Sequence, residues 1–135
     1  MKVSRGLRNN NPLNIRRNRT MWKGLAERQS DKEFFCFSDI AWGYRAAFIT
    51  LRNYRKKHGL KTLAGWISRW APPVENDTDA YIRFVSQKCG LSSDAEPDTG
   101  NMEQMCSIVA AMSQMENGVP ADVESVKKGW ELASR

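Results

Sequence analysis

The sequence lacks the long apolar runs that membrane-spanning or secreted chains carry. No stretch approaches the 18 or so uninterrupted apolar residues of a membrane span. The basic start, with Lys2, Arg5 and Arg8, is followed by asparagines instead of an apolar signal core. We therefore expect no membrane span and no signal peptide, with synthesis in the cytoplasm.

Cysteine and histidine are also scarce. The three cysteines, Cys36, Cys89 and Cys106, show no C-x-x-C spacing, and an odd number argues against a disulfide framework and for reduced, mostly buried thiols. The one histidine, His58, stands beside Lys57 and Gly59 and reads as a helix end. A metal site, a cofactor or a histidine-based nucleophilic triad is therefore not expected.

Basic residues are concentrated at one end of the chain. The 135 residues carry a net charge of +6, and residues 1–30 hold eight Lys or Arg and one acid. The other 105 residues hold 13 basic and 14 acidic residues, so the positive charge is local. Such a region can meet nucleic acid, acidic wall polymers or the carboxylates of peptidoglycan, or it can simply be a solvated face.

The segment from Arg5 to Arg16 is the most unusual part of the sequence. Its twelve residues include four asparagines, three arginines and Pro12. Asparagine is a poor helix former whose amide binds backbone or ligand, and proline pushes the preceding residue toward extended geometry. We expect an irregular loop that presents polar side chains to a ligand; the alternative is that the amides only satisfy their own turns.

Apolar periodicity predicts a mainly helical remainder. Between 21 and 37, aromatic residues alternate with turn residues, which predicts a small hairpin. Capping residues and breakers then bound expected helices over 38–59, 62–71, 77–90 and 101–117, and a last one from Pro120 or Asp122. Met102, Met105 and Met112 are expected in the core, and composition and length suit one compact domain, 1–135.

Several motifs resemble a family of phage-associated lysozyme-like proteins. They are RGLRNNNPLNIRRN from Arg5, Trp22-Lys-Gly24, Gln29-x-Asp31, Phe34-x-x-Phe37, Gly43-x-Arg45-Ala46 and Arg69-Trp-Ala-Pro-Pro-x-Glu-Asn-x-Thr78-x-x-Tyr81. The family pattern reads N-N-P-G-N-I, and this chain has Leu13 where glycine is common. The match runs roughly from Arg5 to Gly90. It implies an α+β, mainly helical, lysozyme-like fold with a small N-terminal β-hairpin.

A weaker likeness is to the flagellar-type glucosaminidases. In those enzymes a similar asparagine segment follows a helix that carries a catalytic glutamate. Only four residues precede Arg5 here, so that upstream helix and its glutamate are absent from this sequence.

Cleavage of a glycan generally needs a protonated carboxyl group and a second carboxylate or an oriented water. Glu75 is the leading candidate acid, because Pro72 and Pro73 fix the backbone before it and nearby aromatic rings would raise its pKa. Its alternative reading is an exposed acid at a helix start. Asp31 and Glu33, on the expected hairpin, are the candidates for the second carboxylate, or else turn residues.

Sugar-binding groups are expected around these acids. Trp22, Trp70 and Tyr81 are candidates to stack on pyranose rings, whereas Trp42 and Trp66 lie on apolar helix faces and are expected in the core. Amides that can hold an acetamido group or the attacking water complete the substrate-binding candidates: Asn10, Asn11, Asn14 and Gln29.

Three functional interpretations follow. The first is a phage or prophage enzyme, lysozyme or lytic transglycosylase in type, that cleaves peptidoglycan strands at the cell wall or from within a phage particle. The second is a non-catalytic wall-binding or virion structural module, with other virion proteins as partners. The third is a nucleic-acid-binding protein, which depends on the basic N-terminal region alone and has no helix-turn-helix signature behind it.

Overall fold

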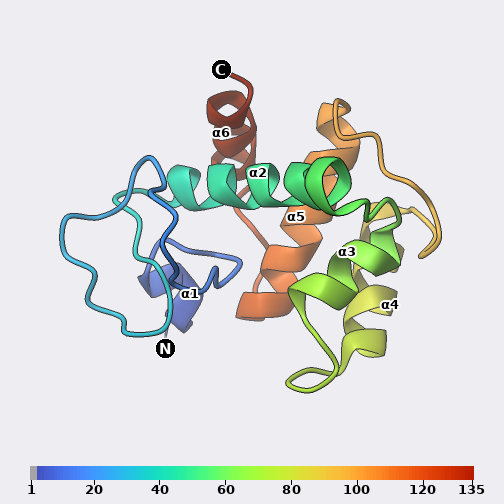
Figure 1. Cartoon of the computed structure of the whole chain (residues 1–135), viewed down its shortest axis with the longest axis horizontal. Helices are drawn as coiled ribbons and strands as arrows, with labels where there is room; N and C mark the ends of the chain where they lie inside the picture. Colours follow the sequence, from blue (N-terminus) through green and yellow to red (C-terminus); the bar gives the residue numbers. More distant parts are fainter. Residues whose placement is uncertain (1–2) are drawn as a thin grey trace.

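The computed structural model describes residues 3–135 and is mainly helical, without a sheet or barrel in that range (Figure 1). Its helices are α1 (Arg5–Arg8), α2 (Ile40–His58), α3 (Leu63–Trp70), α4 (Thr78–Cys89), α5 (Met102–Asn117) and α6 (Val123–Ala133). None of the described helices is both long and apolar enough to cross a membrane. The predicted helical class is confirmed, whereas a lysozyme-like topology stays a prediction.

Side-chain caps set the starts of the longer helices. Asp39, Thr62, Asp77 and Asn101 each accept a hydrogen bond from a backbone amide in the first turn that follows. The predicted boundaries are confirmed to within one or two residues. One correction concerns α2, which is capped by Asp39 and not by Ser38, since Ser38 instead donates its hydroxyl to the Gly24 carbonyl.

The core lies between α5 and the helices around it. Figure 1 shows α2 crossing α5, with α6 on one side and α3 and α4 on the other. Met105 and Met112 are fully buried in α5, as predicted, but Met102 and Met115 are 45% and 37% exposed because they lie on its outer face. Phe48, Trp66 and other large side chains complete this core, which also takes in Leu13 from the N-terminal segment.

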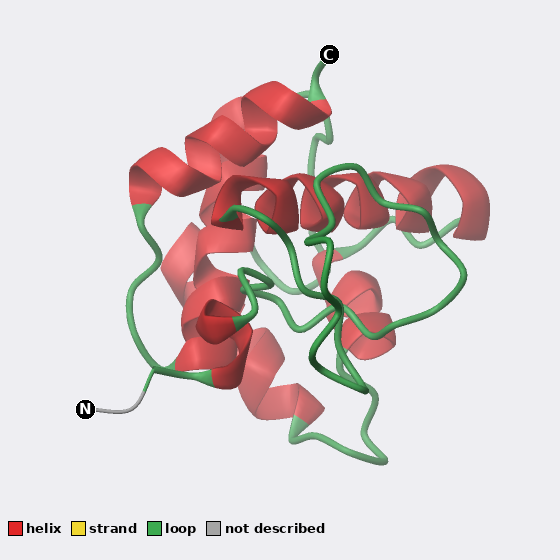
Figure 2. Ribbon diagram, turned by 90° about the vertical axis from the view of Figure 1, so that its left-hand side faces the viewer, coloured by secondary structure: helices red, strands yellow, loops and turns green. Residues whose placement is uncertain are grey.

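Residues 9–39 form a long loop in place of the predicted β-hairpin, and Figure 2 shows no strand there. The only strand-like pairing in it is two isolated antiparallel bridges, Arg16 with Phe34 and Leu25 with Phe37. The physical reason is that side-chain amides occupy the backbone groups that a strand partner would bind. The buried Asn11 amide donates to the carbonyls of Ile15 and Phe35 and accepts from the Ile15 amide.

The expectation that the Arg5–Arg16 segment is entirely irregular is also wrong at its start. Arg5–Arg8 form the single helical turn α1, because Ser4 caps it and its hydroxyl also donates to Asn117. The residues after α1 pack closely against α2, where Asn10 contacts Gly43. A Cβ on Gly43 would overlap the carbonyl oxygen of Asn10, so glycine is required where the loop crosses this helix.

Asp31 is the electrostatic centre of the long loop. Its carboxylate accepts two hydrogen bonds of 2.7 Å from the Arg5 guanidinium, and one each from the Asn9 amide and the backbone amides of Glu33 and Phe34. These bonds, the one from Arg5 foremost, hold the pKa of Asp31 well below its usual range. The carboxylate therefore stabilises the folded loop as an anion.

Acid should weaken this loop through Asp31. A depressed pKa in the folded state gives stability that is present above the unfolded pKa of about 3.9 and is lost as the pH falls below it. Asp31→Asn should lower the free energy of unfolding at pH 7, and the gap to wild type should shrink at pH 3. Urea unfolding at both pH values measures this, with the exposed Asp79→Asn as control. A gap of equal size at both pH values would contradict the assignment.

Candidate functional site

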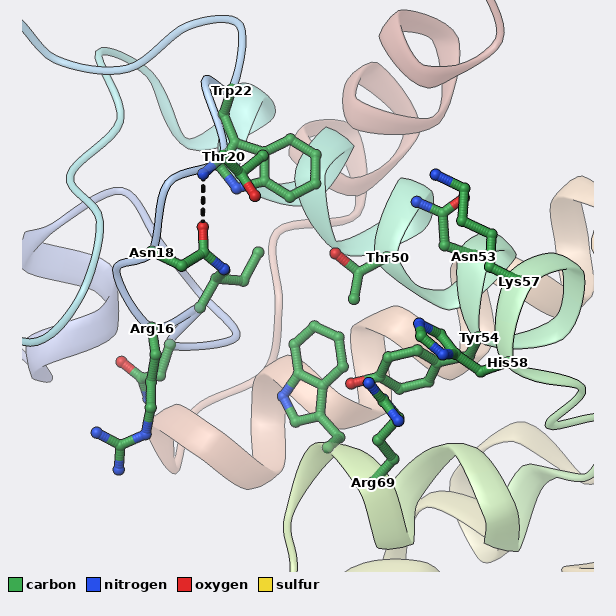
Figure 3. Close-up of a pocket in the computed structure, with 13 residues that line it drawn as sticks. Arg16, Asn18, Thr20, Trp22, Thr50, Asn53, Tyr54, Lys57, His58 and Arg69 are labelled. Carbon is green, nitrogen blue, oxygen red and sulfur yellow. Dashed lines mark hydrogen bonds between the residues drawn. The ribbon is translucent and has the colours of Figure 1, made fainter.

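Two adjacent cavities lie between the long loop and the helices. The larger, which we call the large cavity, has a volume of about 530 Å³ and separates the loop from α2 and α3. Figure 3 shows Asn18, Thr20 and Trp22 on the loop side, opposite Thr50, Asn53, Tyr54, Lys57 and His58 of α2 and Arg69 of α3, whereas the Arg16 guanidinium points away from them. The Trp70 side chain also lines it.

The smaller cavity, of about 150 Å³, contains two carboxyl groups and is called the carboxyl cavity here. Glu75 and Glu116 line it together with Phe34. The large cavity shares Asn14, Arg16 and Trp70 with it. The two cavities are therefore neighbours, and the carboxyl groups lie beside the large cavity.

Glu116 is the half-buried carboxyl of this site. It lies in the last turn of α5, where Asn14 Nδ2 donates to its Oε1 at 2.9 Å and the Tyr81 hydroxyl donates to its Oε2 at 3.0 Å. Burial raises the pKa of Glu116, and the two hydrogen bonds oppose that rise in part. A carboxyl group in this environment keeps its proton to higher pH, as a general acid must.

The contacts of the Glu116 carboxyl come from distant parts of the chain. Asn14 has the left-handed backbone conformation (φ 53°), which asparagine tolerates better than most residues. Asn117, next to Glu116, donates through Nδ2 to the Pro12 carbonyl at 2.8 Å and so ties the asparagine segment to the end of α5. These bonds bring residues about 100 positions apart into one site.

Glu75 lies on the exposed side of the carboxyl cavity, whereas the predicted Glu33 lines neither cavity. Glu75 is in the turn before α4, and its Oε2 is 3.3 Å from the Arg16 guanidinium. Glu33 lies 3.6 Å from the same guanidinium, and both carboxylates are more than half exposed. Glu75 thus shares a cavity with Glu116 but has a wet, ion-paired environment. The raised pKa expected of Glu75 is found at Glu116 instead, where burial is its cause.

The other predicted polar site residues serve the loop. Asp31, Asn10, Asn11 and Gln29 line neither cavity. Asn10 donates to the Phe37 carbonyl, and the Gln29 amide donates to Ala26 and Cys36 and accepts from the Cys36 amide. Asp31 is held as an anion by Arg5, so it has no proton to give. Of the four predicted amides, only Asn14 faces the cavities.

Some of the predicted aromatic residues line the large cavity, and the others are buried or packed under the loop. Trp22 and Trp70 line the large cavity, and Trp70 Nε1 donates to the Leu13 carbonyl at 3.2 Å, which fixes the edge of its ring. Tyr81 is only 4% exposed, so its ring offers no face to a sugar, and its hydroxyl binds Glu116. Trp66 is fully buried, and half-buried Trp42 packs beneath the loop beside Phe35 and Phe37.

Sequence reasoning missed Glu116, although one signal was present. The residue ends a helix whose other face is buried, and an anion there opposes the helix dipole. An acid in such a position is unfavourable unless its charge is removed or compensated.

Within residues 3–135, no group of three or more His, Cys, Asp and Glu side chains is arranged to hold a metal ion.

Comparison with known proteins gives one clear relative. No family model matches the chain. Over 134 residues it is 41% identical to Protein P5 of Pseudoalteromonas phage PM2, an alignment that covers 96% of this chain and 82% of that protein. The chain belongs to the P5 family.

Membership of the P5 family confirms the phage association that the sequence motifs indicated. The name of that relative states no activity, so a cell-wall hydrolase family stays a prediction. The alignment covers nearly the whole chain, so the likeness is not confined to one segment of it.

Proposed function

We propose that this P5-family protein cleaves the glycan strands of bacterial peptidoglycan, with Glu116 as general acid. The observation that carries the proposal is a carboxyl group with a raised pKa in a cavity that opens beside a larger one. Supporting features are the two tryptophans of the large cavity and a phage relative, since phages must cross the bacterial wall. The protein would act at the cell wall or within a phage particle.

The reaction would begin with the proton that Glu116 holds. Transfer of this proton to the glycosidic oxygen lets the bond from that oxygen to the anomeric carbon break, and the leaving sugar departs as an alcohol. Asn14 and Tyr81 then donate to the carboxylate that remains, so they stabilise the product form of Glu116. Neither residue needs to move between the two states.

The second half of the reaction depends on what attacks the anomeric carbon. In hydrolysis, water adds its oxygen there and gives up a proton to a carboxylate, for which Glu75 on the same cavity is the candidate. In transglycosylation, the C6 hydroxyl of the same sugar attacks and returns its proton to Glu116, so one acid suffices. Glu33 would then serve only to orient Arg16.

Digestion of purified peptidoglycan by the wild-type protein tests the proposal. Mass spectrometry of the soluble products should show new reducing-end muropeptides for hydrolysis, or anhydro-muropeptides for transglycosylation. Protein that pellets with the walls but releases no fragments would support the second interpretation, a wall-binding or virion structural module. Chitin oligosaccharides, which share the sugar backbone but lack peptides, serve as the comparison substrate.

A further inference from the structure

The large cavity is positively charged on one wall. Lys57 reaches it from the last turn of α2, and Arg69 reaches it from α3 (Figure 3). No aspartate or glutamate is among the residues that line it. Arg16, on the opposite side of the cavity, is paired with Glu33 and Glu75, so the basic groups of interest are Lys57 and Arg69.

Basic residues at helix ends have a simpler explanation, because they complement the helix dipole. Whether these residues form ion pairs with acids of the protein distinguishes a role at the helix end from a role in binding a ligand. In the same turn of α2, Arg55 lies 3.9 Å from Glu96, whereas within residues 3–135 neither Lys57 nor Arg69 is in an ion pair. The Arg69 guanidinium instead lies over the Tyr54 ring, 5.2 Å from its centre, which holds it at the cavity wall.

We propose that this wall binds the carboxylates of the peptide stem that peptidoglycan carries on its lactyl groups. The inference deepens the proposed function and rests on it. The large cavity adjoins the carboxyl cavity, with Asn14, Arg16 and Trp70 lining both, so the basic wall lies near a strand that is bound at Glu116. The substrate class is thus a peptide-bearing glycan, and a bare glycan would bind less tightly.

The test compares binding of two soluble glycan fragments to the Glu116→Gln variant, which should bind without cutting. One fragment carries stem peptides, and the other is the same material after an amidase has removed them. The stem-bearing fragment should bind about 3- to 10-fold more tightly, the range expected for a few partly exposed ion pairs. Lys57→Gln combined with Arg69→Gln should remove this preference, whereas the exposed Lys56→Gln outside the cavity should preserve it.

Each result has a distinct meaning. Equal binding of both fragments would overturn the peptide-stem site even if wild type cleaves walls. If the stem-bearing fragment binds more tightly but wild type releases no fragments from walls, the peptide-stem site is supported and the proposed cleavage is contradicted. A single-stranded oligonucleotide that competes with the stem-bearing fragment at equal concentration would overturn the proposal in favour of nucleic acid. If Glu116→Gln does not fold, wild type with limit-digest fragments gives the same comparison.

Discussion

Glu116→Gln should lower the rate of peptidoglycan cleavage by about 100- to 10,000-fold, the range over which a positioned general acid accelerates proton transfer. Glutamine keeps the shape of the side chain, and its one carbonyl oxygen can still accept a hydrogen bond from either Asn14 or Tyr81, but its amide has no acidic proton to transfer. Dye release from labelled walls measures the rate. Wall binding, measured by pelleting, should change little.

Two further variants make this result specific to Glu116. Glu103→Gln removes an exposed acid from the first turn of the same helix and should leave the rate unchanged. Glu75→Gln separates the reactions, because hydrolysis through Glu75 would be lost whereas transglycosylation by Glu116 alone would persist. If Glu75→Gln abolished cleavage and Glu116→Gln did not, Glu75 would be the acid, as the sequence first indicated.

Trp66→Ala should give the largest loss of stability among single tryptophan substitutions in the described chain. The side chain is fully buried in α3, and its Nε1 donates to the Leu60 carbonyl at 2.7 Å. Removing a buried tryptophan leaves a cavity and costs about 3–5 kcal/mol in the free energy of unfolding. Urea unfolding followed by far-ultraviolet circular dichroism measures the difference.

Trp22→Ala provides the matched control for this substitution. Trp22 is half-buried in the loop and lines the large cavity, so its removal should affect stability clearly less and wall binding more. An equal loss of stability in both variants would contradict the division between a helical core around Trp66 and a ligand-facing Trp22.

The helices could be predicted from sequence because their signals are local. Thr62, Asp77 and Asn101 each cap a helix within three residues of their own position, and glycines in the left-handed conformation at 59 and 90 end two of them. The loop over 9–39 could not be predicted in the same way. Its stability depends on contacts such as Arg5 with Asp31, which lie 26 residues apart.

The candidate site also divides into residues with local sequence signals and a residue whose role depends on a contact distant in sequence. Asn14 was identified by its amide, and Trp22 and Trp70 were identified as rings beside turn or breaker residues; all three line the large cavity. Glu116 was missed because its partner Asn14 is 102 residues away, and only folding brings the asparagine segment against the end of α5.

The most direct test of the central claim is mass spectrometry of the soluble products when purified peptidoglycan is incubated with wild type and with Glu116→Gln at equal concentration. The account predicts reducing-end or anhydro-muropeptides from wild type and none above background from the variant, which should still pellet with the walls. Identical products and yields from both proteins, or none from either, would contradict it.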